Sequence, residues 1–303
     1  MSRIVTLTLN PAVDVACEAD SVIPGHKIRT RNETHDPGGG GVNVARVLRE
    51  LGVETRAIVL TGGVTGSHLL ELLAAEGVPA RGIPVNGSTR ICTTVHDIST
   101  ATEYRFVPEG PLVTAAELAA CATALIEEQA DWLVLSGSLP RGAPADTYAS
   151  LARAAAARGA RVVIDTSGPG LGAAFGSGLA LIKPSLRELE TLVGKKLPDE
   201  AAQDQAVRNL LDSGAAERIA VSLGAEGALL ATSGGLLRLP AIAVQARGAV
   251  GAGDCFCAAM TWALARGESD ECTLRWGLAA GAASVMNTGT AHPRRSVIEA
   301  FMT

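Results

Sequence analysis

Short apolar runs alternate with alanine-rich amphipathic segments from about residue 112 to the end of the chain. Four of these runs end in a polar residue: Trp132–Ser136, Arg161–Asp165, Leu179–Lys183 and Arg218–Ser222. Continuous apolar strands separated by helical segments are typical of a parallel sheet that is covered on both faces. With right-handed crossovers, the pattern predicts a doubly wound, mostly parallel α/β fold. Ligands bind at the carboxyl ends of strands in such sheets, so the polar residues at those ends are the first candidates for a site.

Two stretches, residues 11–37 and 88–108, do not follow the alternation of strands and helices and contain no convincing helix. Apolar and polar residues alternate in them instead, as in Arg90–His96 and Glu103–Val107. We therefore expect one α/β domain over residues 1–303, with a small antiparallel sheet inserted into it. Such a sheet exposes an apolar face unless something covers it, which indicates a lid, a dimer contact or both.

The composition excludes several classes of protein. A chain of 303 residues that is 47% hydrophobic can bury a core large enough to offset its ordering entropy, so it is not disordered. No run approaches the roughly 20 apolar residues of a membrane helix, and the first residues resemble a strand rather than a signal peptide. We expect a cytoplasmic protein without a membrane partner. The net charge of −5 argues against a nucleic-acid partner but leaves small anionic substrates open.

The sharpest local motif is Val250-Gly-Ala-Gly-Asp254, which precedes a strongly helical run. Small residues before a helix leave successive backbone N–H groups exposed at its positive end, and this arrangement can bind an anion. Asp254 falls in the first turn, where it can accept a proton from a bound hydroxyl. The pattern fits phosphoryl transfer, although an ordinary glycine turn with an Asp cap fits it as well. The chain contains no P-loop and no dinucleotide fingerprint.

The second motif is the run of four glycines at 38–41, followed by Asn43 at the start of a predicted helix. Glycines in such number cost backbone entropy, and their usual reason is the close approach of backbone to a ligand. A flexible hinge at the junction with the lid is the alternative, and both can hold.

Weaker signals lie at other strand ends. Glu188 follows Lys183 and Ser185 in the first turn of a predicted helix, where it can hold Mg²⁺ or simply complement the helix dipole. Ser222-Leu-Gly-Ala-Glu-Gly227 suits a strand end that passes beneath a nucleotide, and Ser136-Gly-Ser138 is a turn with exposed hydroxyls. Six cysteines and five histidines show no metal-ligand spacing, so structural zinc is not expected.

Charged residues of the lid segments form another candidate group. Asp14 follows the first strand, and Lys27, Arg90 and Arg105 are cations of the two lid segments. A lone Arg on an edge strand is usually solvated or protects the edge. Three cations in one lid can instead form a phosphate clamp.

In this order, the motifs resemble the ribokinase/PfkB carbohydrate kinase family nearly from end to end. Gly39-Gly-Gly-Val-Asn-Val-Ala45 with Gly52 and Gly62 matches the N-terminal signature, and Gly251-Ala-Gly-Asp254 matches the C-terminal one. Finer details resemble the phosphosugar branch, which contains 1-phosphofructokinases, tagatose-6-phosphate kinases and minor (type 2) 6-phosphofructokinases. The four-glycine run looks most like the last group. The implied fold is ribokinase-like, with helices on both faces of the sheet and a β lid.

The resemblance also implies residue roles. Asp254 would be the general base, and the backbone amides of Gly251, Ala252 and Gly253 would neutralise the transferring phosphoryl group. Sugar hydroxyls would bind Asp14, Gly39, Gly40, Asn43 and Ser138. The phosphate already on the sugar would bind Lys27, Arg90 and Arg105. ATP would bind Lys183, Ser185, Ser222, Gly224 and Gly227, with Glu188 organising Mg²⁺.

The implied reaction is ATP-dependent phosphorylation of fructose 6-phosphate at its 1-hydroxyl, in a homodimer that pairs through the lid. 1-Phosphofructokinase and tagatose-6-phosphate kinase activities are alternatives within the branch, and a non-catalytic sugar-phosphate sensor is a remote one. Two departures from the family pattern are Ser185, where Asn is usual, and Cys255, where Ser is usual. The turn that contains Asn287 is the candidate K⁺ site.

Overall fold

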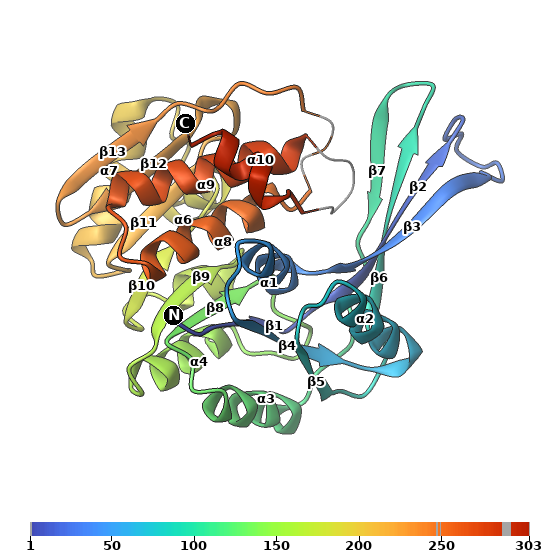
Figure 1. Ribbon diagram of the computed structural model, residues 1–303, viewed down its shortest axis with the longest axis horizontal. Helices are drawn as coiled ribbons and strands as arrows, with labels where there is room; N and C mark the ends of the chain where they lie inside the picture. Colours follow the sequence, from blue (N-terminus) through green and yellow to red (C-terminus); the bar gives the residue numbers. More distant parts are fainter. Residues whose placement is uncertain (1, 247, 249, 287–291, 303) are drawn as a thin grey trace.

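The computed structural model describes residues 2–246, 248, 250–286 and 292–302 (Figure 1). Its strands are β1 Ile4–Thr8, β2 Ala12–Ala19, β3 Thr30–Gly38, β4 Thr55–Thr61, β5 Ala80–Pro84, β6 Arg90–Asp97, β7 Thr102–Phe106, β8 Trp132–Ser136, β9 Arg161–Asp165, β10 Leu179–Ile182, β11 Arg218–Ser222, β12 Ala228–Thr232 and β13 Gly235–Leu239. Its helices are α1 Gly40–Glu50, α2 Gly63–Ala75, α3 Ala115–Glu127, α4 Thr147–Ala156, α5 Pro169–Ala173, α6 Leu186–Val193, α7 Glu200–Asp212, α8 Ala252–Ala265, α9 Asp270–Val285 and α10 Arg295–Ala300, with a 3₁₀ turn at Gly224–Glu226.

Nine strands form the main sheet in the order β13-β12-β11-β10-β9-β8-β1-β4-β5. The strands from β11 to β5 are parallel, and β12 and β13 add an antiparallel edge. All four apolar runs with polar ends are strands of this sheet, so the predicted mostly parallel α/β fold is confirmed. Their carboxyl ends lie at one edge of the sheet, as parallel pairing requires.

Helices cover both faces of the main sheet (Figure 1). Side chains of α3, α4, α5, α6 and α7 pack with one set of strand residues, which includes Leu7, Leu135 and Ile164. Side chains of α1, α8, α9 and α10 pack with the opposite set, which includes Ile4 and Val134. Because neighbouring strand residues point to opposite faces, burial of both sets explains why these strands read as continuous apolar runs.

The two predicted lid segments form a separate four-stranded sheet, in the order β3-β2-β6-β7 (Figure 1). β2 pairs with β3 antiparallel and with β6 parallel, and β6 pairs with β7 antiparallel. The sheet is therefore mixed rather than purely antiparallel, because β2 and β6 both continue outward from the main sheet. Several large apolar residues are exposed on it or beside it: Ile23, Ile28, Ile91, Ile98, Tyr104, Phe106 and Val107. Over the described parts of the chain, no helix is both long and apolar enough to span a bilayer.

Candidate active site

The start of α8 places Asp254 at the carboxyl edge of the main sheet. Gly251 is the residue before the helix and takes a positive φ of 77°, which favours glycine. The residues from Cys255 to Ala263 are all buried, so the helix start is anchored by its core face. Asp254 itself stays partly exposed. The backbone amides of the first turn and the Asp254 carboxylate are thus presented together.

A hydrogen bond from α1 holds the Asp254 side chain. Asn43 Nδ2 donates to Asp254 Oδ2 at 2.8 Å. Burial, reinforced by the charge of Asp165, raises the pKa of Asp254 to about 7, whereas the Asn43 hydrogen bond lowers it. A carboxyl with a pKa near neutrality can take up and release a proton in this range, as a general base must. Asn43 was predicted to bind the sugar. In this structure its side-chain amide donates its hydrogen bond to Asp254, the predicted base.

Lys183 and Asp165 form an ion pair below the same helix start. Lys183 Nζ lies 3.2 Å from Asp165 Oδ1, and the Lys183 side chain is 5% exposed. Burial opposes the charge of Lys183, but Asp165 and other negative groups outweigh it, so the pKa of Lys183 lies above its usual value. Burial raises the pKa of Asp165 to about 6 against the opposing charge of Lys183. A Cβ on Gly253 would lie 3.3 Å from Lys183 Nζ, so a fixed ammonium lies beside the candidate anion-binding turn, residues 251–253.

Sequence reasoning missed Asp165, although it ends one of the four apolar runs. The available signal was positional. Ile164 pairs with Ile182 in the parallel register of β9 and β10, so the next residues on the two strands, Asp165 and Lys183, are neighbours.

The sugar-binding candidates gather where the second sheet meets the main sheet. Burial raises the pKa of Asp14 to about 6, and the nearby charges of Arg105 and Arg90 oppose the shift. Asp14 and Arg105 line a small cavity of about 20 Å³ together with Val250, which directly precedes the candidate anion-binding turn. The second sheet therefore contributes side chains right up to the start of α8.

Arg90 has structural contacts as well as a charge near Asp14. Its Nη1 donates to the Pro108 carbonyl at 2.9 Å, and its Nη2 donates to the Asn10 carbonyl at 2.8 Å. Its Nε is buried without a hydrogen-bond partner among the described residues. Lys27 is exposed between β2 and β3 and contacts no other described side chain through an ion pair or hydrogen bond. The structure thus brings Arg90 and Arg105 together around Asp14 but does not bring Lys27 to them.

The glycine run fits the backbone tightly against neighbouring strands. A Cβ on Gly38 would overlap the Asp14 carboxylate, and one on Gly40 would overlap Ser136 Oγ. Gly39 takes a φ of 111°, and a Cβ on Gly41 would lie 2.6 Å from the Leu7 carbonyl oxygen. Close approach is therefore required here, although the partner is the protein's own backbone and side chains.

Ser138 belongs to the same edge of the sheet. It follows β8, is exposed, and lies 3.3 Å from Asn10 Nδ2, which also donates to the Glu109 carbonyl at 2.9 Å. Asn10 Oδ1 is buried and has no partner in the described part of the chain. Asn10 was not predicted as a site residue, and its place two residues after the end of β1 was the available signal.

The nucleotide-binding candidates Ser222, Gly224 and Gly227 line a cavity of about 610 Å³. Ala252 and Gly253 of the candidate anion-binding turn line it too, so the cavity extends to the start of α8. Its remaining walls are largely apolar and were not predicted: Ala225, Ala241, Ile242, Ala243, Val244, Ala246, Phe256, Leu278, Gly281, Ala282 and Val285. An apolar slot that ends at exposed amides suits a ring with a phosphate chain.

Ser185 and Glu188 form a capping box at the start of α6. Ser185 N and Oγ donate to Glu188 Oε2 at 2.8 and 2.9 Å. The Ser222 amide donates to the Pro184 carbonyl at 3.1 Å, which joins this turn to the nucleotide-binding candidates. The charge of Glu188 also acts on both Asp165 and Lys183. Glu188 therefore has a structural role at the start of α6, and its charge also reaches the buried ion pair. Asn287 lies outside the described residues.

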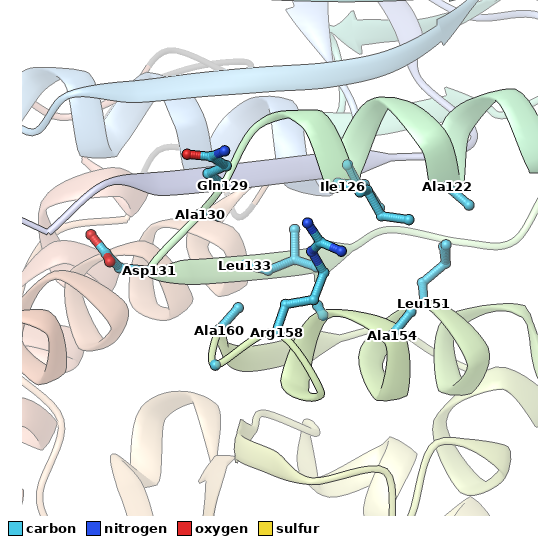
Figure 2. A pocket seen from close by; sticks show the side chains of 13 residues that line it. Ala122, Ile126, Gln129, Ala130, Asp131, Leu133, Leu151, Ala154, Arg158 and Ala160 are labelled. Atoms are coloured by element: carbon cyan, nitrogen blue, oxygen red, sulfur yellow. The ribbon is translucent and has the colours of Figure 1, made fainter.

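A second cavity, of about 520 Å³, lies between α3 and α4 (Figure 2). Gln129, Asp131, Leu133, Arg158 and Ala160 are among its lining residues, and they surround the amino ends of β8 and β9. None of the predicted site residues lines it. Ligands of doubly wound sheets bind at carboxyl ends, and the candidate site residues lie at that opposite edge.

The chain is similar to known proteins along nearly its whole length. The chain is 44% identical over 301 residues to a protein of Mycobacterium tuberculosis named ATP-dependent 6-phosphofructokinase isozyme 2, which covers 99% of this chain and 88% of the relative. Crystal structures of Escherichia coli phosphofructokinase-2 have the same fold. The complex with potassium has a TM-score of 0.95 and 37% identity, and the complex with fructose-6-phosphate has 0.93 and 36%; each covers 99% of this chain and 98% of the other.

A further structure of the Escherichia coli protein is described as its tetrameric inhibited form, with a TM-score of 0.93 and full coverage of both chains. The model of the pfkB family carbohydrate kinases matches residues 7–296, a span that holds the glycine run, the Asp165–Lys183 pair and Asp254. The chain therefore belongs to the pfkB family of carbohydrate kinases.

Proposed function

We propose that this protein is an ATP-dependent 6-phosphofructokinase, which transfers the γ-phosphoryl group of ATP to the 1-hydroxyl of fructose 6-phosphate. The products are ADP and fructose 1,6-bisphosphate. The observation that carries the proposal is the position of Asp254. The residues just before it line both cavities: Val250 lines the small one with Asp14 and Arg105, and Ala252 and Gly253 line the one of 610 Å³. The charges of Lys183 and Asp14 both act on the Asp254 carboxyl. The names of the relatives support the choice of fructose 6-phosphate.

Asp254 takes the proton of the acceptor hydroxyl, because a carboxylate with a pKa of about 7 is partly ionised at neutral pH. The hydroxyl oxygen then attacks the γ-phosphorus as the bond to the β-phosphate oxygen breaks. Negative charge on the transferring group is stabilised by the amides of Gly251, Ala252 and Gly253. Lys183, held in place by Asp165, adds a fixed positive charge beside the same turn.

On the acceptor side, Asp14, Gly39, Gly40 and Ser138 contact sugar hydroxyls, and Asn43 orients the base. Arg105 and Arg90 bind the 6-phosphate, since their charges already surround Asp14. The proposal extends to Lys27, which is exposed and so reaches the phosphate only when the segment between β2 and β3 approaches the site.

On the donor side, the adenine ring occupies the apolar cavity, with Ser222, Gly224 and Gly227 along the nucleotide and Ser185 near its phosphates. Mg²⁺ fits this site, because Mg²⁺ needs only one or two carboxylates besides substrate phosphates and water. The carboxylates of Glu188 and Asp165 offer such oxygens, and the charge of one acts on the other. Bound Mg²⁺ would neutralise phosphate charge. We keep Asn287 as part of a proposed K⁺ site, which the potassium complex of the Escherichia coli relative supports.

The proposed architecture is one domain with a β lid, which pairs with a second copy to form a homodimer. Exposed Ile91, Tyr104, Phe106 and Val107 support this pairing, because contiguous exposed apolar residues mark interaction surfaces. A cytoplasmic location is part of the proposal, and the six free cysteines support a reducing compartment.

The deciding experiment is a coupled ADP-release assay with fructose 6-phosphate, fructose 1-phosphate, tagatose 6-phosphate and unphosphorylated sugars. We expect the highest kcat/KM with fructose 6-phosphate. Preference for another phosphosugar would reassign the acceptor within the branch. Turnover only with an unphosphorylated sugar would remove the phosphate clamp, and no turnover with any acceptor would reject the kinase proposal.

A further inference from the structure

Two histidines join the second sheet to the main body of the protein outside the site described above. His35 lies on β3 and His68 lies on α2, which packs against β3. His35 Nδ1 is 3.0 Å from His68 Nε2, and the rings meet edge to face with centroids 5.3 Å apart. The side chains are 39% and 40% exposed, so the pair is accessible from solvent.

A carboxylate faces the outer nitrogen of each ring. His35 Nε2 is 3.1 Å from Glu33 Oε1, and His68 Nδ1 is 3.7 Å from Glu71 Oε2. The row Glu33–His35–His68–Glu71 thus contains two hydrogen bonds, whereas the His68–Glu71 contact is too long for one. Two neutral imidazoles supply the two protons that these bonds need. One of the protons therefore lies between the two inner nitrogens, His35 Nδ1 and His68 Nε2.

A metal ion between the inner nitrogens would take the place of the proton that they share. Both ring protons would then reside on the outer nitrogens, which face Glu33 and Glu71, and metal-bound histidines usually show this arrangement with carboxylate partners. Nitrogen ligands lie about 2.0–2.1 Å from Zn²⁺ in tetrahedral sites, which separates two of them by roughly 3.4 Å. His35 Nδ1 and His68 Nε2 are 3.0 Å apart, so the two rings need to move apart only slightly to admit the ion.

We propose that His35 and His68 bind one divalent transition-metal ion of the imidazole-preferring class, such as Zn²⁺, Cu²⁺ or Ni²⁺. In the described residues, no set of three or more His, Cys, Asp or Glu side chains surrounds a common metal position. Water therefore completes the coordination, and the affinity is that of an open two-histidine site. Binding to a cationic pair releases one proton to solvent, and binding to a neutral pair shifts one proton from an inner to an outer nitrogen.

The position of the pair gives the ion a structural effect. His35 precedes Asp36 on β3, and neighbouring strand residues point to opposite faces. Asp36 faces the cavity that Asp14 and Arg105 line, and its Oδ1 is 3.6 Å from Arg46 Nη2. A metal that bridges His35 and His68 fastens β3 to α2 directly behind this cavity. The ion thus cross-links the second sheet to the main body, and we call this bridge between His35 and His68 the staple.

Titration with Zn²⁺ alone, without nucleotide or phosphate, tests the site by calorimetry. The wild-type protein binds Zn²⁺ at this site, whereas His35→Gln and His68→Gln each weaken that binding about tenfold or more. The control His96→Gln, a change on β6 away from the pair, keeps wild-type binding. Absence of Zn²⁺ binding by the wild type, or unchanged binding in both variants of the pair, overturns the proposal.

Hydrogen exchange tests the staple independently of affinity. Zn²⁺ slows exchange of the amides of residues 32–36 in the wild type but not in His68→Gln, although that substitution lies on α2. Because both histidines are substantially exposed, the variants keep the wild-type melting temperature without metal. Unchanged exchange in the wild type at saturating Zn²⁺ would show that the ion does not bridge the two elements, and would overturn the staple. Neither measurement uses catalysis, so both outcomes are separable from failure of the proposed kinase activity.

Discussion

Asn43 Nδ2 donates a 2.8 Å hydrogen bond to Asp254 Oδ2, which joins residues 211 positions apart at the starts of α1 and α8. The amide has a defined orientation, because Arg46 Nη1 lies 3.5 Å from Asn43 Oδ1 and Arg46 is itself fixed by Glu76 through two 2.6 Å hydrogen bonds. Asn43, at the glycine-rich start of α1, therefore orients the side chain of the proposed base, Asp254.

Loss of this hydrogen bond should move the pH dependence of catalysis. The bond lowers the pKa of Asp254, so Asn43→Ala should raise it, and a base with a higher pKa needs a higher pH to ionise. If the pKa rises by about one unit, kcat at pH 7 falls roughly fivefold while kcat at pH 9 changes little. The measurement is kcat against pH. Asn43→Asp, which adds a like charge, should shift the acid limb further. An unshifted acid limb in both variants would mean that Asn43 does not act on the base.

How much of this could be predicted depends on sequence distance and on strand register. The strands of the main sheet and their mostly parallel pairing follow from local apolar patterns, so this part of the fold was predictable. The parallel pairing of β2 with β6 has no such local signal. Asp165 was predictable in principle, since its pairing with Lys183 follows from two neighbouring parallel strands that end together. The Asn43–Asp254 bond was not, because nothing local determines which helix starts meet. The apolar lining at Ile242 and Val244 also lacks a local signal, since both lie in an irregular segment.

Asp165→Asn should shift the same acid limb in the opposite direction. The charge of Asp165 helps to raise the pKa of Asp254, so its removal lowers that pKa and extends activity to lower pH. The maximal kcat falls nonetheless, because Lys183 loses its partner. A buried charge left alone costs about 3–5 kcal/mol of stability, which urea unfolding would measure. Wild-type stability in this variant would show that Lys183 does not depend on Asp165.

Substitution of each arginine near Asp14 should distinguish a role in substrate binding from a role in stability. Arg105 is exposed on β7, so Arg105→Ala should raise KM for fructose 6-phosphate by about 10–100-fold, the value of a charge-assisted hydrogen bond, with the melting temperature unchanged. Arg90→Ala should raise KM and also lower the melting temperature, because Arg90 holds the Pro108 and Asn10 carbonyls. Steady-state kinetics and thermal melting decide the point. An unchanged KM in Arg105→Ala contradicts its place in the clamp.

Gly40 tests whether the glycine run is required by packing. A Cβ there would overlap Ser136 Oγ and lie 2.8 Å from the Gly137 amide nitrogen, so Gly40→Ala should destabilise the fold by about 1–3 kcal/mol. The matched control is Gly234→Ala, where the nearest atom would lie 3.5 Å away and the change should stay within about 0.5 kcal/mol. Urea unfolding compares the two. Equal stabilities would show that space at Gly40 is not limiting, and that a ligand must explain the glycine.

Asp254→Asn should lose activity and gain stability together. Without the base, kcat falls by about 10²–10⁴-fold with little change in KM.

The folded-state pKa of Asp254 is raised from 3.8 to about 7, chiefly by burial. The folded protein therefore binds more protons than the unfolded chain between these values, and the free energy of unfolding decreases as pH rises through this window. Above pH 7 the wild type carries the full cost of the buried charge, and the neutral amide does not. Urea unfolding at pH 8 should thus show the variant more stable by at least about 1 kcal/mol, with the difference vanishing near pH 4. A variant that is inactive yet no more stable at pH 8 would show that Asp254 ionises without the opposition that its burial implies.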